Sequence, residues 1–233
     1  MTSRRDDARA PLWRGSVSRL EGFSDAVFAF AVTLLVVSLE VPRSFDDLEL
    51  TMRGFPAFGV CFALLVMIWH QHRKFFQRYP LEDTLTVALN AALLFVVLFY
   101  VYPLKFLFTT LFDILFGLGA GAAPSLGDGM RSLMVIYGLG YLSVFGLFVL
   151  LHARALTKRA ALGLDDLDVF DAYSGLQHCA IHVTVALLSI AIVLTGGPER
   201  GFWSGISYGL IGPLAGVHGA WRGRRRERRS GTA

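Results

Sequence analysis

The stretch Arg19-Leu-Glu-Gly-Phe-Ser-Asp25 opens an apolar run that continues to Val41. It places the hydroxyl of Ser24 and the carboxylate of Asp25 just inside a segment that is long enough to span a membrane. A carboxylate near the bilayer interior costs on the order of a few kcal/mol unless it is paired or hydrated, so such a residue marks a functional site by default. We therefore expect Asp25 to have a partner, and Arg19 is the candidate.

The composition predicts an integral membrane protein. Of the 233 residues, 54% are hydrophobic and 17% are charged, and the mean hydropathy is +0.53. Because a spanning helix needs about 20 mostly apolar residues, we expect an all-α membrane protein with six transmembrane helices. The predicted spans are 23–41, 55–69, 85–102, 133–151, 172–194 and 202–220. After Pro103 we expect a separate interfacial helix in the apolar run 106–118, then a flexible glycine-rich connection at 117–129.

Basic residues predict the orientation of these spans. Six spans put both termini on one side, and most of the 22 lysines and arginines fall on that side. The bias predicts that both termini are cytoplasmic. The segment 1–18 is then a basic cytoplasmic N-terminus without the apolar core of a signal peptide, 19–221 is the membrane domain, and 222–233 is an Arg-rich cytoplasmic tail. We interpret that tail as a topology anchor on anionic lipid, and we expect no nucleic-acid partner.

Orientation predicts that four polar residues lie at one depth. Ser24 and Asp25 begin the first span, His72 follows the second, and Asn90 lies about two turns, ~11 Å, into the third. They could form one network near the inner membrane surface. Taken singly, His72 could instead extend to the headgroups, and Asn90 could make an ordinary hydrogen bond between helices.

Three motifs resemble a known family, the potassium-permeable channels of the transmembrane protein 175 family. They are Arg19-x-x-x-Phe23-Ser24-Asp25, then Trp69-x-x-His72-x-x-x-Phe76, and finally Asn90-x-x-Leu-Leu-Phe-Val-Val leading to Pro103. The resemblance implies a potassium channel in a lipid bilayer, in prokaryotes the cell membrane, built as a homotetramer around a central pore that the first helices line. It also implies that the Thr-Val-Gly-Tyr-Gly filter is absent, and this sequence lacks it.

A helical period through the first span gives a stripe of residues on one face. Its members are Ala26, Phe30, Thr33, Val37 and Glu40. The resemblance suggests that this stripe faces the pore, with Phe30 as the narrow hydrophobic gate and Thr33 as a hydroxyl ring; Phe30 departs from the aliphatic residue common in the family. Glu40 would form a ring of carboxylates at the outer mouth, or it is an ordinary helix-end charge. Periodicity alone also allows another stripe, formed by Val27, Leu34, Ser38 and Val41.

Two other classes compete with a channel. His178-x-x-x-His182 has a spacing that can bind a metal, but no carboxylate lies between the two histidines, so we expect no metal, no cofactor and no enzyme. Cys61 and Cys179 form no C-x-x-C pair and are expected to be packing residues. The alternative function is a proton-coupled secondary transporter that uses Asp25 or His72; Pro213 with Gly212 and Gly216 could break the sixth span, but no matching break is evident in the first three spans, as the repeats of such transporters would require.

Overall fold

The computed structural model describes residues 18–38, 41–117, 128–196 and 200–230, and these ranges are helical apart from short connections. The helices are α1 (Arg19–Val37), α2 (Phe45–Arg53), α3 (Phe55–Arg78), α4 (Thr84–Phe116), α5 (Asp128–Thr157), α6 (Asp166–Leu194), α7 (Arg200–Ser207), the 3₁₀ turn η2 (Tyr208–Leu210) and α8 (Ile211–Ser230). Within the described ranges, five helices are long and apolar enough to cross a membrane, namely α1, α3, α4, α5 and α6.

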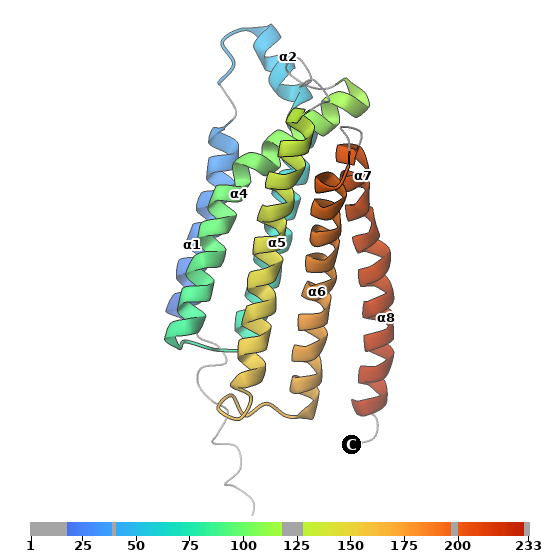
Figure 1. Ribbon diagram of the computed structural model, residues 1–233. Helices are drawn as coiled ribbons and strands as arrows, with labels where there is room; N and C mark the ends of the chain where they lie inside the picture. The colour runs from blue at the N-terminus through green and yellow to red at the C-terminus, as the bar shows by residue number, and fades with distance from the viewer. Residues whose placement is uncertain (1–17, 39–40, 118–127, 197–199, 231–233) are drawn as a thin grey trace, which may run out of the picture.

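The long helices form a bundle in which α4 and α5 are central (Figure 1). Helix α4 packs against α1 and α3 on one side and against α5 on the other. Helix α5 packs most extensively against α6, and α6 in turn carries α7 and α8. The start of α1 and the end of α8 lie at the same end of the bundle, and α2 lies at the opposite end (Figure 1). We call these the terminal end and the α2 end.

Helix α1 begins four residues before the predicted span because a capping box fixes its first turn. The hydroxyl of Ser18 accepts a hydrogen bond from the backbone N–H of Leu20 at 3.1 Å, and the carboxylate of Glu21 accepts one from the backbone N–H of Ser18 at 3.2 Å. The Ser18 hydroxyl also donates to Glu82 at 2.8 Å, which ties the start of α1 to the connection between α3 and α4. The opening stretch of the sequence is therefore the first two turns of a helix.

One of the sequence predictions for the helices is wrong, and the sixth predicted span is not continuous. The run 106–118 does not form a separate interfacial helix, because α4 continues for 33 residues through Pro103 and ends at Gly117, whose φ is 64°. Proline removes one backbone hydrogen bond and bends a helix without ending it when neighbouring helices support it, and α4 changes direction in its upper part (Figure 1). The sixth predicted span is interrupted by η2, and Pro213 lies in the first turn of α8, where proline is tolerated.

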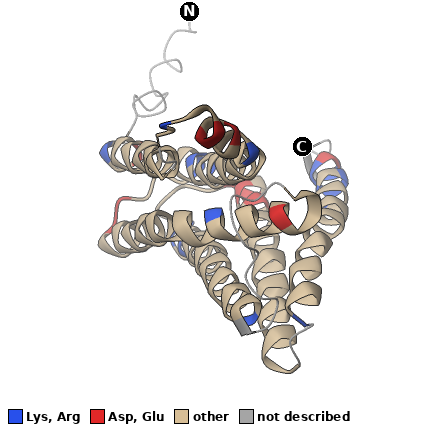
Figure 2. Ribbon diagram, turned by 90° about the horizontal axis from the view of Figure 1, so that it is seen from above, with Lys and Arg blue, Asp and Glu red and all other residues tan. Residues whose placement is uncertain are grey.

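The sequence analysis missed α2. Its N-terminus has a capping box between Ser44 and Asp47, each of which accepts a hydrogen bond from the backbone N–H of the other at 3.1 Å. This S-x-x-D spacing is a recognisable start signal for a helix. The acidic positions of α2 face the viewer in Figure 2, which looks onto the α2 end of the bundle. Most of the predicted connection 117–129 lies outside the described residues.

Glycines let α5 approach its two neighbours closely. A Cβ atom added at Gly140 would lie 2.3 Å from the ring of Tyr100 on α4, and one added at Gly138 would lie 2.7 Å from Ile190 on α6. The buried Tyr100 hydroxyl donates to the carbonyl of Tyr137 at 3.1 Å, so its ring cannot move aside without losing that bond. Small residues of this kind allow the close helix packing that replaces the hydrophobic effect as a driving force within lipid.

We predict that Gly140→Ala destabilises the protein by about 1–3 kcal/mol, because the added methyl group must displace the Tyr100 ring. Thermal unfolding in detergent measures the effect. Gly146→Ala is the matched control, since it lies on the same helix and a Cβ there meets no atom within 4 Å. Equal unfolding temperatures for the two variants would contradict this account of the packing.

Candidate functional site

A directional chain of hydrogen bonds connects α3, α4 and α1 near the terminal end. The His72 ring nitrogen Nε2 donates to Asn90 Oδ1 at 2.7 Å, and Asn90 Nδ2 donates to the Ser24 hydroxyl at 3.0 Å. That hydroxyl donates onward to the carbonyl of Leu20 at 2.7 Å. His72 and Asn90 are 1% exposed and Ser24 is 0% exposed. The chain therefore pairs buried polar groups from three helices with one another.

His72 lies inside the bundle because α3 extends to Arg78, well beyond the predicted end of that span at residue 69. The alternative in which this side chain extends to the headgroups is therefore wrong. Its ring packs between Phe28 of α1, at 5.5 Å between ring centroids, and Phe76 of α3, at 4.6 Å. These aromatic contacts hold the imidazole in the orientation that the hydrogen bond to Asn90 needs.

The partner of Asp25 is Trp69, and the expected pairing with Arg19 is wrong. The indole N–H of Trp69 donates to Asp25 Oδ1 at 2.7 Å, and the guanidinium of Arg73 lies over the Trp69 ring at 5.6 Å. Within the described residues, no ion pair joins Arg19 to Asp25. Side chains six residues apart on a helix point about 120° away from each other around its axis, whereas neighbours on one face are three or four residues apart. Phe23, the remaining residue of the motif, is 61% exposed.

The buried face of α1 consists of Ser24, Phe28, Ala31 and Leu35, and the opposite face is free. Four of the predicted pore residues lie on that free side, because Ala26 and Thr33 are exposed, Phe30 is 55% exposed and Val37 is 70% exposed. On the alternative stripe, Val27, Leu34 and Ser38 are partly buried within the subunit, and Val41 lies beyond the end of the helix. Glu40 lies outside the described residues.

The far end of α1 is held by Lys105, which the sequence analysis did not single out. Its ammonium group donates to the backbone carbonyl of Ser38 at 2.6 Å and to the Ser38 hydroxyl at 2.8 Å. Ser38 is the C-cap of α1, a helix without a basic residue in its last turn, so Lys105 supplies a cation to the negative end of the helix dipole. The signal was a single lysine inside a long apolar segment.

The connection between α3 and α4 is fixed to the end of α5. Asp83 accepts hydrogen bonds from Arg154 Nη2 at 2.7 Å and Nε at 3.2 Å, and one from the Thr86 hydroxyl at 2.7 Å. The hydrogen bonds from Arg154, and then the one from Thr86, lower the pKa of Asp83 to about 2, so this carboxylate is ionised at neutral pH. Burial raises the pKa of the adjacent Tyr79 to about 12.

The two histidines of α6 have packing partners. His182 Nδ1 lies 2.6 Å from the hydroxyl of Tyr141, and its ring stacks on Phe145 with centroids 4.0 Å apart. The ring of His178 lies 5.0 Å from that of His182. Among the residues that the structure describes, no three His, Cys, Asp or Glu side chains could hold a metal ion together. Both cysteines are buried and unbridged.

Comparison with known proteins identifies the family. A curated potassium channel from Marivirga tractuosa is 41% identical over 212 residues, which cover 87% of this chain and 86% of that protein. The chain belongs to the TMEM175 family. The model of the family, described as "Endosomal/lysosomal potassium channel TMEM175", matches residues 19–100, which contain the whole hydrogen-bond chain but not Lys105. The resemblance seen in the sequence is thereby confirmed.

Two solved structures have the same fold. One is a variant of the potassium channel MtTMEM175 in complex with a Nanobody-MBP fusion protein, with a TM-score of 0.80 and 38% identity over 91% of this chain and 96% of that chain. The other is a lysosomal potassium-selective channel TMEM175 homolog from Chamaesiphon minutus, with a TM-score of 0.58 and 22% identity over 88% and 96% of the two chains. Together with the five apolar helices, these matches show an all-helical integral membrane protein.

We predict that Asn90→Ala destabilises the subunit by about 1–3 kcal/mol, because it leaves the His72 N–H buried without an acceptor. Thermal unfolding of the purified protein measures the effect, with Ser143→Ala as a control that loses only a bond to its own helix. A double-mutant cycle with Ser24→Ala should show less than additive loss, since both changes break the same chain. Strict additivity would show that the three side chains do not act together.

Proposed function

We propose that this protein is a potassium-permeable channel in which the exposed face of α1 lines a central pore. The observation that carries the proposal is the free face of α1, found in a chain 41% identical over most of its length to a curated potassium channel. Helix α1 contacts α3 and α4 through its inner face, whereas the residues on its opposite face, Phe30 and Val37 among them, are exposed. A helix with one face packed against its subunit and one exposed face is suited to lining an ion pore.

Thr33 is the polar group that the free face offers to an ion. Its hydroxyl hydrogen is donated to the carbonyl of Ala29 at 3.0 Å, one turn back on the same helix. The oxygen lone pairs are therefore turned away from the helix and can accept the positive charge of a partly dehydrated cation. A ring of such hydroxyls replaces part of the hydration shell of potassium, which is how a pore can select among ions.

Phe30, one turn closer to the terminal end, is the proposed gate. Four phenyl rings at one level make a narrow apolar constriction, which gives a passing ion no substitute for its water and closes by dewetting. Val37, one turn beyond Thr33, continues the apolar lining toward the α2 end. We place the terminal end in the cytoplasm of a prokaryotic cell, because α1 begins there at Arg19 and the arginine-rich end of α8 lies there as well.

A homotetramer completes the pore, because one free helix in each subunit cannot enclose an ion path and rotational symmetry supplies the others. Native mass spectrometry in a mild detergent should give a particle of four subunits. A species that stays monomeric under conditions where the fold is intact would count against the channel.

Current recordings in planar bilayers test the function itself. Unitary currents carried by potassium are expected, whereas slow flux that follows the pH gradient would indicate the proton-coupled transporter instead. The transporter has less support in the structure, because the two side chains that would carry its protons already make hydrogen bonds: His72 to Asn90, and Asp25 to Trp69.

We predict different effects on current, but the same direction of change in selectivity, for two variants of the pore face. Phe30→Ala should raise the current and lower the preference for potassium over sodium, because a wider constriction stays wet. Thr33→Ala should lower the selectivity with little gain in current, because it removes hydroxyls while the width changes little. Reversal potentials with potassium on one side and sodium on the other measure both. Wild-type behaviour of both variants, with altered permeation for Leu34→Ala, would move the pore to the other stripe.

A further inference from the structure

A basic crevice lies at the terminal end, away from α1. It has a volume of about 560 Å³ and is bounded by α3, α6 and α8, with His152 of α5 at its back. Its size falls within the range of ligand-binding pockets. Gly175 of α6 is required here, because a Cβ at this position would lie 2.3 Å from Nε2 of His152.

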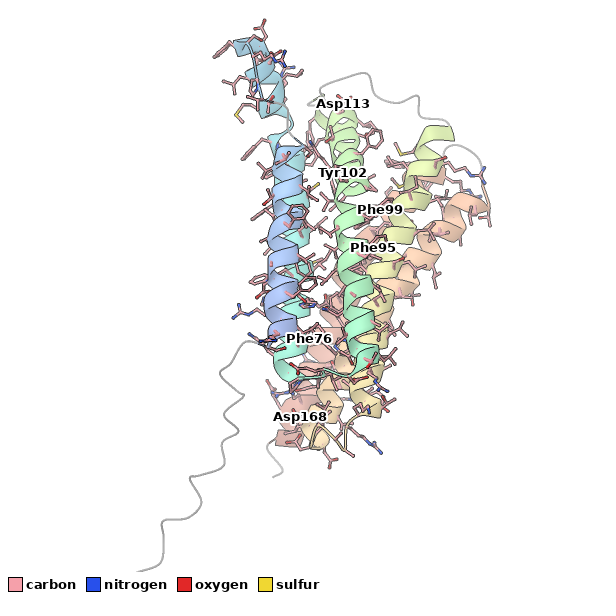
Figure 3. The ribbon with its side chains drawn as sticks, turned by 90° about the vertical axis from the view of Figure 1, so that its left-hand side faces the viewer. Phe76, Phe95, Phe99, Tyr102, Asp113 and Asp168 are labelled. Atoms are coloured by element: carbon pink, nitrogen blue, oxygen red, sulfur yellow. The ribbon has the colours of Figure 1, made fainter. Side chains whose placement is uncertain are left out.

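The wall of the crevice carries more positive than negative charge. Lys74 and Arg78 come from α3 and Arg226 comes from α8, and Asp171 of α6 is the single carboxylate among the lining residues. A second carboxylate, that of Asp168, lies outside the lining, and its Oδ1 is 3.1 Å from Arg78 Nη2. Figure 3 labels Asp168 at the lower end of the bundle. Three cations thus face two carboxylates even when this outer one is counted.

Asp171 positions the two arginines without using all of their donors. Its carboxylate accepts from Arg78 Nη2 at 2.5 Å and from Arg226 Nε at 2.9 Å, and its side chain is 12% exposed. A guanidinium has five N–H groups, so both terminal nitrogens of Arg226 and the Nη1 of Arg78 make no hydrogen bond within the described residues. Lys74 forms no ion pair there either. The crevice therefore presents two guanidinium groups held by Asp171 and an exposed ammonium group, with N–H donors left over that can bind an anion.

We propose that this crevice binds the phosphate of an anionic phospholipid headgroup from the leaflet at the terminal end. Arg226 and Lys74 hold the phosphate oxygens, and the hydroxyl of Ser174, which lies one turn from Asp171 on α6, adds a neutral donor. Arginine is suited to this task because its planar fork matches two phosphate oxygens at once. Basic pockets between transmembrane helices at the membrane surface are typical sites for such headgroups.

The surroundings favour a lipid over a soluble anion. The lining continues toward the membrane interior with Met67, which is 40% exposed. On helix α8, His218 is the lining residue furthest from the terminal end. Its neighbour in the chain, Val217, is 71% exposed. An acyl chain attached to the bound phosphate can lie along these apolar side chains. Inorganic phosphate has no group that would make this contact.

Native mass spectrometry of the purified full-length protein tests the proposal. The protein is reconstituted in phosphatidylcholine with or without phosphatidylglycerol, then released into mild detergent, and retained lipid is counted for each subunit. We expect selective retention of phosphatidylglycerol. Lys74→Gln, which breaks no ion pair, should lower the apparent affinity about tenfold, the value of one lost charge-assisted hydrogen bond, and adding Arg226→Gln should abolish retention. Arg224→Gln, on the same helix but outside the lining, should bind as the wild type does.

Two results would overturn the proposal. One is a lack of selectivity, seen either between proteins or between lipids. In the first case the wild type and the double variant Lys74→Gln, Arg226→Gln retain phosphatidylglycerol equally, and in the second the wild type retains the two lipids equally. The other is that inorganic phosphate, tested over the same range of concentrations, displaces phosphatidylglycerol and raises the unfolding temperature as much as the lipid does, which would assign the crevice to a soluble anion. Because the single Lys74 variant leaves the Asp171 ion pairs intact, the test does not depend on the folding of the double variant.

Discussion

The attachment of α1 to α4 at two levels is the constraint on which the rest of this structure depends. At the terminal end, Asn90 donates to Ser24 and accepts from His72, and at the α2 end Lys105 donates to the last carbonyl of α1. The two anchors are about four helical turns apart on both helices, which run in parallel. In lipid, burying apolar side chains gives little net drive for helix association, so interhelical hydrogen bonds and close packing carry it. These polar contacts therefore determine how α1 is rotated about its own axis.

That rotation determines what the free face of α1 can do. Because Ser24, Phe28, Ala31 and Leu35 are turned inward, Thr33 and Phe30 point out of the subunit. The two faces of α1 therefore have different roles. Polar residues on the inner face hold the helix in place, and the outer face can carry a gate without contributing to the stability of the subunit. The same separation applies to the basic crevice, which lies on α3, α6 and α8 and shares no residue with the pore face. Substitutions in the proposed lipid site and on the proposed pore face are then expected to act independently.

The sequence was sufficient to predict the class of fold and most of the inner network, but not the exact partners. Long apolar segments predicted the membrane helices, and the depth of Ser24, His72 and Asn90 followed from the orientation of the spans. The six-residue spacing within one helix already argued against Arg19 as the partner of Asp25, but Trp69 could not be derived in this way, because it reaches Asp25 from another helix. Lys105 was missed because hydropathy treats a lysine as the end of a span, whereas a backbone carbonyl at a helix terminus can satisfy it. The course of α4 through Pro103 was missed for a related reason, since proline ends helices in water more readily than in a packed bundle.

Thiol accessibility along α1 in conducting channels tests the central claim most directly. Cys61 and Cys179 are buried, so single cysteines can be introduced with little background, and a small cationic, membrane-impermeant thiol reagent can be applied during bilayer recording. Thr33→Cys should react and reduce the current, while Leu35→Cys on the anchored face should not react. Modification of Leu34→Cys and Ser38→Cys, with Thr33→Cys unaffected, would contradict the account, because it would mean that the hydrogen bonds to α4 do not hold α1 in the orientation described.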